Sequence, residues 1–137
     1  MSSAPSASLQ DMLTNTESFS GLAVRDLDAA RRFYGETLGL EVSVLDEQYG
    51  LLDVKLGDGR SLLVYGKPDQ QPANFTVLNF RVPDIEEAVD GLTARGVEFE
   101  RYEGMPQDEK GVMREGGPYI AWFRDPAGNI LSVLQQR

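Results

Sequence analysis

The chain has 137 residues, of which 41% are hydrophobic and 26% charged, a composition typical of one globular domain. It contains no cysteine and no histidine, which excludes disulfides, thiolate metal sites and the commonest general base at neutral pH. Thirteen basic and twenty-two acidic residues give a net charge of −9, so nucleic acid is not an expected partner. The negative charge could attract a cationic small molecule or simply keep the chain soluble.

The N-terminal segment lacks a basic start followed by an apolar stretch, so we do not expect it to be a secretory signal. No apolar run in the sequence approaches the roughly 20 residues that cross a bilayer, so we expect no membrane contact and a cytoplasmic location. Residues 1–17 are rich in Ser, Ala and Pro and are expected to form a tail. Within it Leu9, Met12 and Leu13 could form one helical turn that docks on the body or on a partner chain. A loosely ordered end is the alternative.

Residues 18–66 have the pattern of a strand, a helix and three further strands. The β-rich run 19–24 leads to Asp26, whose carboxylate is expected to cap the helix that follows. Apolar residues recur at helical spacing up to Gly39, where glycine ends the helix because it adopts a left-handed conformation at little cost. Three strands are expected at about 41–46, 50–56 and 61–66, the last two joined by a hairpin turn at 57–59.

Residues 75–137 repeat this pattern after a connector at 67–74. A β-rich run at 75–82 leads to Asp84 as the second helix cap, and Gly96 is expected to end the second helix. Strands are expected at about 97–102, 119–124 and 129–134, with a hairpin turn at 125–128. The long glycine-rich segment 103–118 is expected to be either a functional lid or a merely mobile loop.

The two halves read as copies of one unit. Aligning residues 21–30 with 79–88 matches Val24 with Val82, Asp26 with Asp84, Leu27 with Ile85, and Ala30 with Ala88. A strand–helix–strand step followed by antiparallel hairpins makes a small curved mixed sheet with its helix on one side. We therefore predict a single α+β domain after residue 18, in which two βαβββ modules form a cupped mixed sheet with the helices outside. A small ligand is expected in the trough between the sheets.

Four segments carry a resemblance to a known family: residues 23–27 (AVRDL), 32–34 (RFY), 38–40 (LGL) and 123–129 (FRDPAGN). Together with the repeat, they resemble the vicinal oxygen chelate superfamily, which includes glyoxalase I, bleomycin-resistance proteins and extradiol dioxygenases. The resemblance covers nearly everything after residue 18. It implies a glyoxalase-like fold of paired modules, commonly assembled as a homodimer.

The resemblance also identifies where metal-using members of the superfamily place their ligands. The corresponding positions here are Phe19, Val77, Ser132 and, in the first half, Leu63 or Val64. Hydrocarbon side chains occupy three of these four positions and a neutral hydroxyl the fourth, whereas divalent ions need several nitrogen, oxygen or sulfur donors. We therefore expect no metal and no other cofactor.

The same positions predict a mostly apolar and aromatic binding trough, because alternate residues of a strand share a face. The expected ligand-binding residues are Phe19, Gly21, Leu63, Tyr65, Val77, Asn79, Arg81, Trp122 and Ser132. Such a lining favours a flat or amphipathic organic molecule that Asn79 and Arg81 orient. Alternatively, Phe19, Val77 and Leu63 fill the space and leave no cavity.

Metal-independent binding of a small molecule, a drug or an amphipathic metabolite, is therefore the favoured function, and no catalytic residue is assigned. The alternative is a lyase, isomerase or dioxygenase-like enzyme whose atypical site is built from Asp53, Lys55, Tyr65, Tyr102, Glu103 or Glu109. For Asp53, an exposed strand carboxylate paired with Lys55 or a neighbour is the simpler interpretation. A third possibility is an accessory module whose dimer face is its function.

Overall fold

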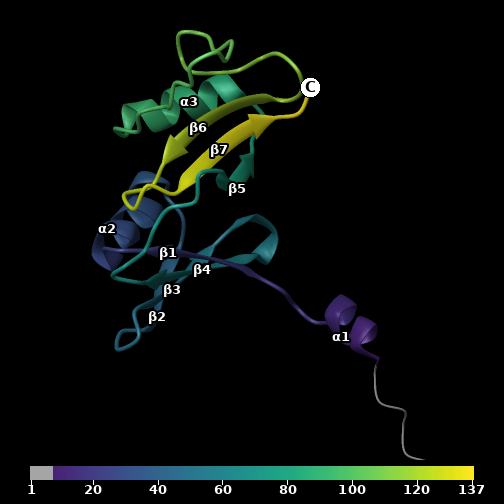
Figure 1. Ribbon diagram of the computed structural model, residues 1–137, viewed down its shortest axis with the longest axis vertical. Helices are drawn as coiled ribbons and strands as arrows, with labels where there is room; N and C mark the ends of the chain where they lie inside the picture. The colour runs from purple at the N-terminus through teal and green to yellow at the C-terminus, as the bar shows by residue number, and fades with distance from the viewer. Residues whose placement is uncertain (1–7) are drawn as a thin grey trace, which may run out of the picture.

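The computed structural model describes residues 8–137, in which two β-sheets carry the fold (Figure 1). In the first module, strand β1 (Ser20–Val24) is followed by helix α2 (Leu27–Arg32), which widens into a π-helical turn, η1 (Phe33–Thr37). Strands β2 (Val42–Asp46), β3 (Leu51–Lys55) and β4 (Ser61–Gly66) follow, with the short 3-10 turn η2 (Gly57–Gly59) before β4. The order in this sheet is β1-β4-β3-β2, with β1 parallel to β4 and the other pairs antiparallel.

The second module repeats the order of strand, helix and antiparallel hairpin. It contains β5 (Thr76–Arg81), α3 (Ile85–Ala94), β6 (Tyr119–Arg124) and β7 (Ile130–Gln135). The sheet order is β5-β7-β6, with β5 parallel and β6 antiparallel to β7. The predicted α+β class and the duplicated strand–helix–strand step are therefore confirmed. Across residues 8–137, every helix is too short or too polar to cross a membrane.

Both helices begin and end at the residues that local chemistry predicts. The carboxylate of Asp26 accepts a hydrogen bond from Ala29 N (3.0 Å), and that of Asp84 accepts one from Glu87 N (3.1 Å). Gly39 and Gly96 lie after the two helices with φ of 75° and 93°, a conformation that favours glycine.

One predicted strand is wrong. At about 97–102 the structure has a single bridge, between Phe99 and Phe123. Pairing with β6 continues only as far as Glu100, whose N–H donates to Trp122 O (2.7 Å). The next free donor, Tyr102 N–H, is taken by the Gln107 side chain (2.8 Å), so the chain leaves the sheet there. The side chain of Gln107, five residues further along the chain, thus binds the backbone donor that a continued strand would have used.

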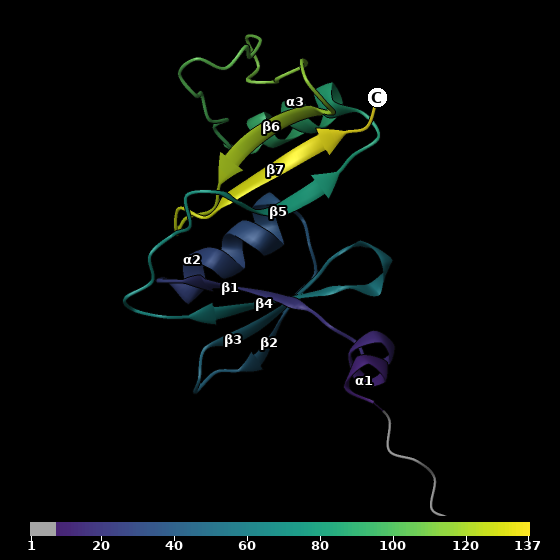
Figure 2. The ribbon, with the colours of Figure 1, turned by 45° about the vertical axis from the view of Figure 1, so that its right-hand side comes forward.

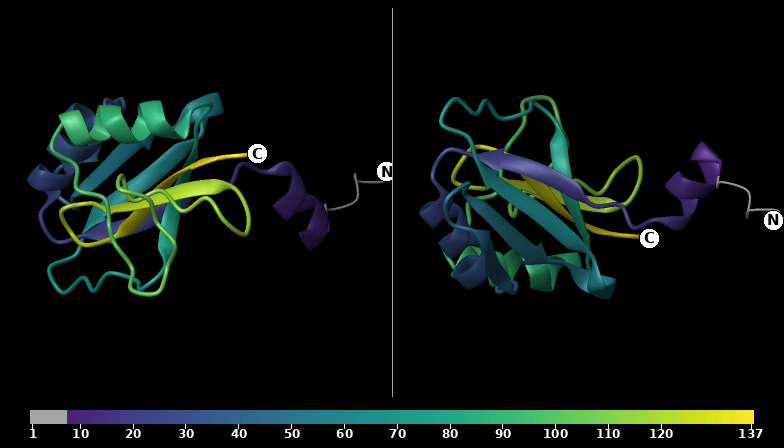
Figure 3. Two further views of the ribbon diagram at one scale, coloured as in Figure 1. Left: turned by 90° about the horizontal axis from the view of Figure 1, so that it is seen from above. Right: turned by 90° about the horizontal axis from the view of Figure 1, so that it is seen from below.

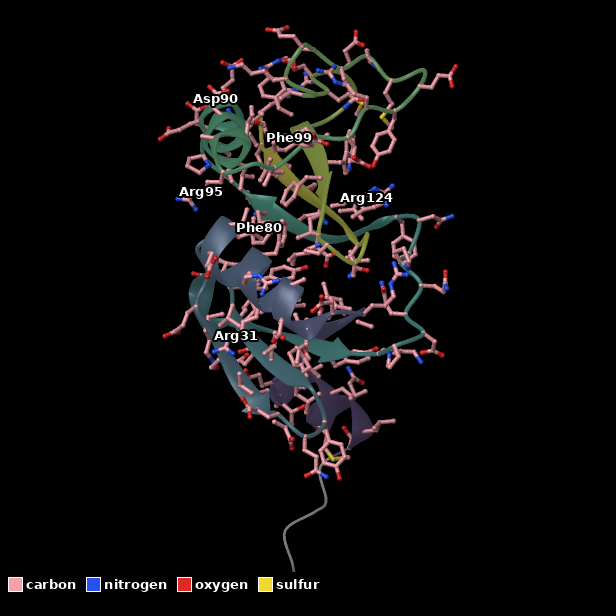
Figure 4. The ribbon with its side chains drawn as sticks, turned by 90° about the vertical axis from the view of Figure 1, so that its left-hand side faces the viewer. Arg31, Phe80, Asp90, Arg95, Phe99 and Arg124 are labelled. Carbon is pink, nitrogen blue, oxygen red and sulfur yellow. The ribbon has the colours of Figure 1, made fainter. Side chains whose placement is uncertain are left out.

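Helix α2 lies between the two sheets and joins the modules into one core (Figures 1 and 2). Tyr34 and Phe123 are fully buried, and the Phe33 ring lies 6.4 Å from the Phe123 ring, measured between centroids. Arg95, which follows α3, lies beside α2 (Figure 4) and donates from Nη1 to Thr37 O (3.0 Å). The relative placement of the modules is therefore set by aromatic packing and by direct hydrogen bonds.

The face of the first sheet that points away from α2 is open. Leu22 and Val24 are buried against the helix, whereas Gly21 and Ala23 alternate onto the opposite face. Figure 3 (right) shows this face of the four strands turned toward the viewer. The first sheet thus presents a broad surface of exposed and half-buried side chains, among them Tyr65, which is 37% exposed.

A short helix, α1 (Leu9–Asn15), forms where Leu9, Met12 and Leu13 predict a helical turn. Ser8 caps it, because its Oγ accepts a hydrogen bond from Asp11 N (3.1 Å). No residue of α1 is buried, and Leu9 and Leu13 are each 69% exposed. Figure 1 shows the helix projecting from the body, so it does not dock on the body of its own chain.

The segment 103–118 is an ordered loop tied to α3. Asp108 Oδ1 accepts hydrogen bonds from the backbone N–H groups of Lys110 and Val112 (both 2.9 Å), and its Oδ2 accepts one from Arg114 Nε (3.2 Å). Lys110 and Arg114 also pair with Glu86 of α3, and Val112 is fully buried. The loop is therefore anchored at its centre.

We expect Asp108→Asn to lower the stability of the protein at pH 7 and to flatten its dependence on acid. Burial opposes the ionisation of Asp108, but the N–H groups of Val112 and Lys110 and the Arg114 guanidinium outweigh it and hold the pKa of its carboxyl below the usual range. A carboxyl with a lowered pKa stabilises the fold above its unfolded-state pKa of about 3.9, and this contribution is lost as the pH falls through the folded-state pKa.

The measurement is Tm by circular dichroism between pH 7 and pH 3. The wild type should lose stability more steeply than the variant across the acidic part of this range. Asp28→Asn, at an exposed position of α2, is the control and should follow the wild type. Parallel curves for Asp108→Asn and the wild type would refute the role of this carboxylate.

Candidate functional site

A hollow of about 970 Å³ lies where the first sheet meets the free edge of the second. Its walls are residues 18–20, 56–58, 60–62 and 77–81, together with Leu134. Five consecutive residues of β5 line it, because within residues 8–137 β5 pairs only with β7 and leaves its other edge unpaired. The volume lies at the upper end of the roughly 300–1,000 Å³ found for small-molecule sites.

Four of the nine predicted ligand-binding residues line this hollow. They are Phe19, immediately before β1, and Val77, Asn79 and Arg81 of β5. Phe19 is 64% exposed, so its ring forms a wall of the hollow and does not fill it. Phe19 and Val77 therefore border an open space, contrary to the alternative in which they fill the trough.

Three further predicted residues cluster on the open face of the first sheet. Gly21 is in register with Leu63 of β4, and a Cβ at Gly21 would lie 3.9 Å from the Tyr65 ring. Gly21, Leu63 and Tyr65 are thus neighbours, as the alternation of strand residues predicts. They do not line the hollow.

The last two predicted residues, Trp122 and Ser132, are cross-strand neighbours in the second sheet. Ser132 is fully buried and its Oγ donates to Asn79 Oδ1 (2.5 Å), so it acts on the hollow through Asn79. That bond fixes the side-chain amide of Asn79, whose Nδ2 makes no hydrogen bond with residues 8–137. Trp122 instead packs edge-on against Tyr102, with ring centroids 5.4 Å apart.

The β3–β4 turn contributes residues to the hollow that were not predicted from the sequence. Leu56, Asp58, Arg60 and Ser61 all line the hollow. Asp58, which lies between two glycines, adopts a left-handed backbone conformation with φ of 61° and so reverses the chain direction in the turn. The G-D-G pattern predicts the hairpin, but no sequence signal indicates that its tip faces β5 of the other module.

The residues at the family's metal positions do not fit a metal. Phe19, Val77 and Leu63 offer carbon, and the Ser132 hydroxyl is already bound to Asn79. Within residues 8–137, the acidic side chains form no cluster of three or more that could hold a metal ion. Asp53 pairs with Lys55 (3.0 Å), which holds the pKa of the Asp53 carboxyl below its usual range. The predicted pairing of Asp53 with Lys55 is therefore confirmed, whereas the Asp53 side chain is only 14% exposed and thus more buried than expected.

The fold and these motifs place the chain in a family. Residues 15–133 match the Glyoxalase/Bleomycin resistance protein/Dioxygenase superfamily, and the chain belongs to it. The resemblance carried by the four sequence segments is thereby confirmed.

Similar proteins include enzymes and binding proteins. A protein of Vibrio parahaemolyticus named "Probable lactoylglutathione lyase" is 28% identical over 127 residues, 85% of this chain and 87% of its own length. The structure of a glyoxalase family protein from Enterococcus faecalis is 26% identical with a TM-score of 0.65, covering 90% of this chain and 99% of its own. TnmS3, an antibiotic-binding protein from Streptomyces, shares the fold at 24% identity and a TM-score of 0.64, over 90% of this chain and 98% of its own.

Proposed function

We propose that this protein binds an amphipathic organic molecule, a drug or a metabolite, without a metal ion, and that it does so in the cytoplasm. The observation that carries the proposal is the hollow itself, whose walls have Phe19 and Val77 at positions where metal-using relatives place ligands. The same fold serves TnmS3, an antibiotic-binding protein, so it is compatible with sequestration.

Different residues of the hollow would make the apolar and the polar contacts with a ligand. Phe19, Val77, Leu56 and Leu134 supply apolar surface, and burial of that surface would provide the affinity, at roughly 25 cal/mol per Å² before the costs of ordering the ligand. Asn79 supplies a side-chain amide that Ser132 holds in one orientation. A polar group of the ligand can therefore be recognised at one end of an otherwise apolar surface.

We expect Phe19→Ala to weaken binding of flat aromatic compounds about tenfold or more, because the Phe19 ring lines the hollow immediately before β1 and is exposed for stacking on a ligand. The measurement is isothermal titration calorimetry of the wild type and the variant against a panel of amphipathic aromatic drugs. Phe75→Ala is a matched control, since Phe75 is also 64% exposed but does not line the hollow. Uniform absence of binding to the wild type, or an equal loss in both variants, would overturn the proposal.

An enzymatic function is the second candidate, because a relative 28% identical to this chain carries the name of a lactoylglutathione lyase. The metal content of the purified protein separates the two. A stoichiometric transition metal that is retained through dialysis would favour the enzyme and refute metal-independent binding.

We further propose that the protein is a homodimer in which open sheet faces meet. The open face of the first sheet carries Gly21, Leu63 and Tyr65. Helix α1, which precedes the first strand of this sheet in the chain, exposes Leu9 and Leu13. Exposed apolar side chains such as Tyr65, Leu9 and Leu13 favour a contact with another chain. The molar mass from light scattering, measured on the samples used for calorimetry, distinguishes a dimer from a monomer.

A further inference from the structure

We propose that the hollow recognises the anionic group of an amphipathic organic acid through Arg60 and Arg81. This inference rests on the proposed binding function and names the class of its ligand. The proposed ligand is opposite in charge to the cationic molecule that a net charge of −9 could attract.

Like most arginines of the chain, Arg60 and Arg81 form no ion pair among residues 8–137, and what distinguishes them is that both line the hollow. The ion pairs among residues 8–137 use three lysines and two arginines, and neither Arg60 nor Arg81 is among them. Residues 1–7 contain no Asp or Glu that could supply a partner. Both arginines line the hollow. Two unneutralised guanidinium groups at one hollow are expected to attract an anion.

The two arginines reach the hollow from different modules. Arg60 follows the η2 turn at the start of β4, and Arg81 ends β5. A guanidinium group binds a carboxylate through two parallel N–H donors, a geometry that favours planar anions over a single neutral acceptor. A ligand bound between Arg60 and Arg81 would therefore contact both modules.

The free edge of β5 adds backbone donors to the same place. Val82 N–H donates to Leu134 O (2.8 Å), so Val82 turns its backbone groups toward β7. Because these groups alternate along a parallel strand, those of Arg81 and Asn79 point to the unpaired side. The Asn79 Nδ2 donor lies at the same wall. The hollow is thus rich in donors as well as in positive charge.

The local charge of the hollow opposes the charge of the whole chain. Its lining contains one carboxylate, Asp58, against the two arginines, and Asp58 forms no ion pair with either. At physiological ionic strength the Debye length is about 8 Å, so acidic residues elsewhere on the surface are largely screened. The nearby guanidinium groups then decide which ligand charge is favoured.

The test compares three ligands that share one apolar part and differ in charge. The probes are 2-naphthoate, 2-naphthamide and 2-naphthylmethylammonium, titrated calorimetrically into the wild type and into Arg60→Gln, Arg81→Gln and Arg25→Gln. Arg25 is an exposed arginine that does not line the hollow, so its variant is the control. Circular dichroism verifies that each variant is folded.

We expect the wild type to bind naphthoate at least tenfold more tightly than the other two probes. Arg60→Gln and Arg81→Gln should each weaken naphthoate binding about tenfold and leave naphthamide binding unchanged, with no effect from Arg25→Gln. Equal binding of naphthoate and naphthamide, or preference for the ammonium probe, would overturn the anion assignment while leaving the binding function in place. Failure of all three probes to bind would overturn both.

Discussion

Replacing Phe123 by alanine is expected to lower the free energy of unfolding by about 3–5 kcal/mol. Phe123 is fully buried in β6, and its ring centroid lies 5.6 Å from that of Phe99 and 6.4 Å from that of Phe33. Phe33 belongs to the first module and Phe99 to the second, so the Phe123 ring fills the junction between them. Its removal leaves a cavity that neither rigid sheet can close.

Urea unfolding of the wild type and Phe123→Ala, followed by circular dichroism, measures this loss. Phe75→Ala is the matched control, because Phe75 is 64% exposed and its loss should cost less than about 0.5 kcal/mol. A loss below about 1 kcal/mol for Phe123→Ala would show that the modules do not share one core. Separate transitions for two modules in the wild type would contradict the shared core as well.

Replacing Asp125 by alanine is expected to cost about 3 kcal/mol or more, because its buried carboxylate accepts four hydrogen bonds. Its Oδ1 accepts from the backbone N–H groups of Ala127 and Asn129 (both 2.9 Å), which shapes the β6–β7 turn. Its Oδ2 accepts from Tyr34 Oη (2.8 Å) and from Asn129 Nδ2 (2.9 Å). Asn129 Nδ2 also donates to Ala23 O in β1 (2.9 Å), so the network crosses between the modules.

The variant Tyr34→Phe separates the contribution of the junction from that of the turn. Burial and the neighbouring Asp125 carboxylate raise the pKa of Tyr34 far above its usual value, so its hydroxyl remains a donor at every working pH. Its removal takes one of the four bonds and leaves the turn intact, so we expect a loss of about 1–2 kcal/mol. Urea unfolding measures both variants, and equal losses would show that the turn bonds contribute nothing.

Sequence reasoning located the elements whose causes are local. Asp26 and Asp84 cap their helices, and Gly39 and Gly96 end them, because each needs only a few neighbouring residues to do so. The predicted strand at 97–102 failed for the opposite reason. Its backbone donor at Tyr102 is bound by Gln107, a contact that depends on how the following loop folds back.

The sequence likewise predicted some residues of the candidate site and missed others. Phe19 and Arg81 line the hollow as expected, because family positions and strand alternation identify them. Arg60 was missed, since it lies in a hairpin turn whose composition explains only the turn. Trp122 was placed on the correct sheet but contacts Tyr102 instead of the hollow, because it belongs to β6 and β7 lies between β6 and β5.

The amino-acid sequence alone determined the class of fold, the duplicated module and the absence of histidine and cysteine as metal ligands, because each follows from short-range pattern or from residue types that the chain lacks. Tertiary structure alone decided that the β3–β4 turn faces β5 and that Arg60 and Arg81 share one hollow. The physical reason is that this pairing depends on the packing of η1 against β6, through Phe33, Tyr34 and Phe123. Such packing joins residues about 90 positions apart, a distance at which local propensity carries no information.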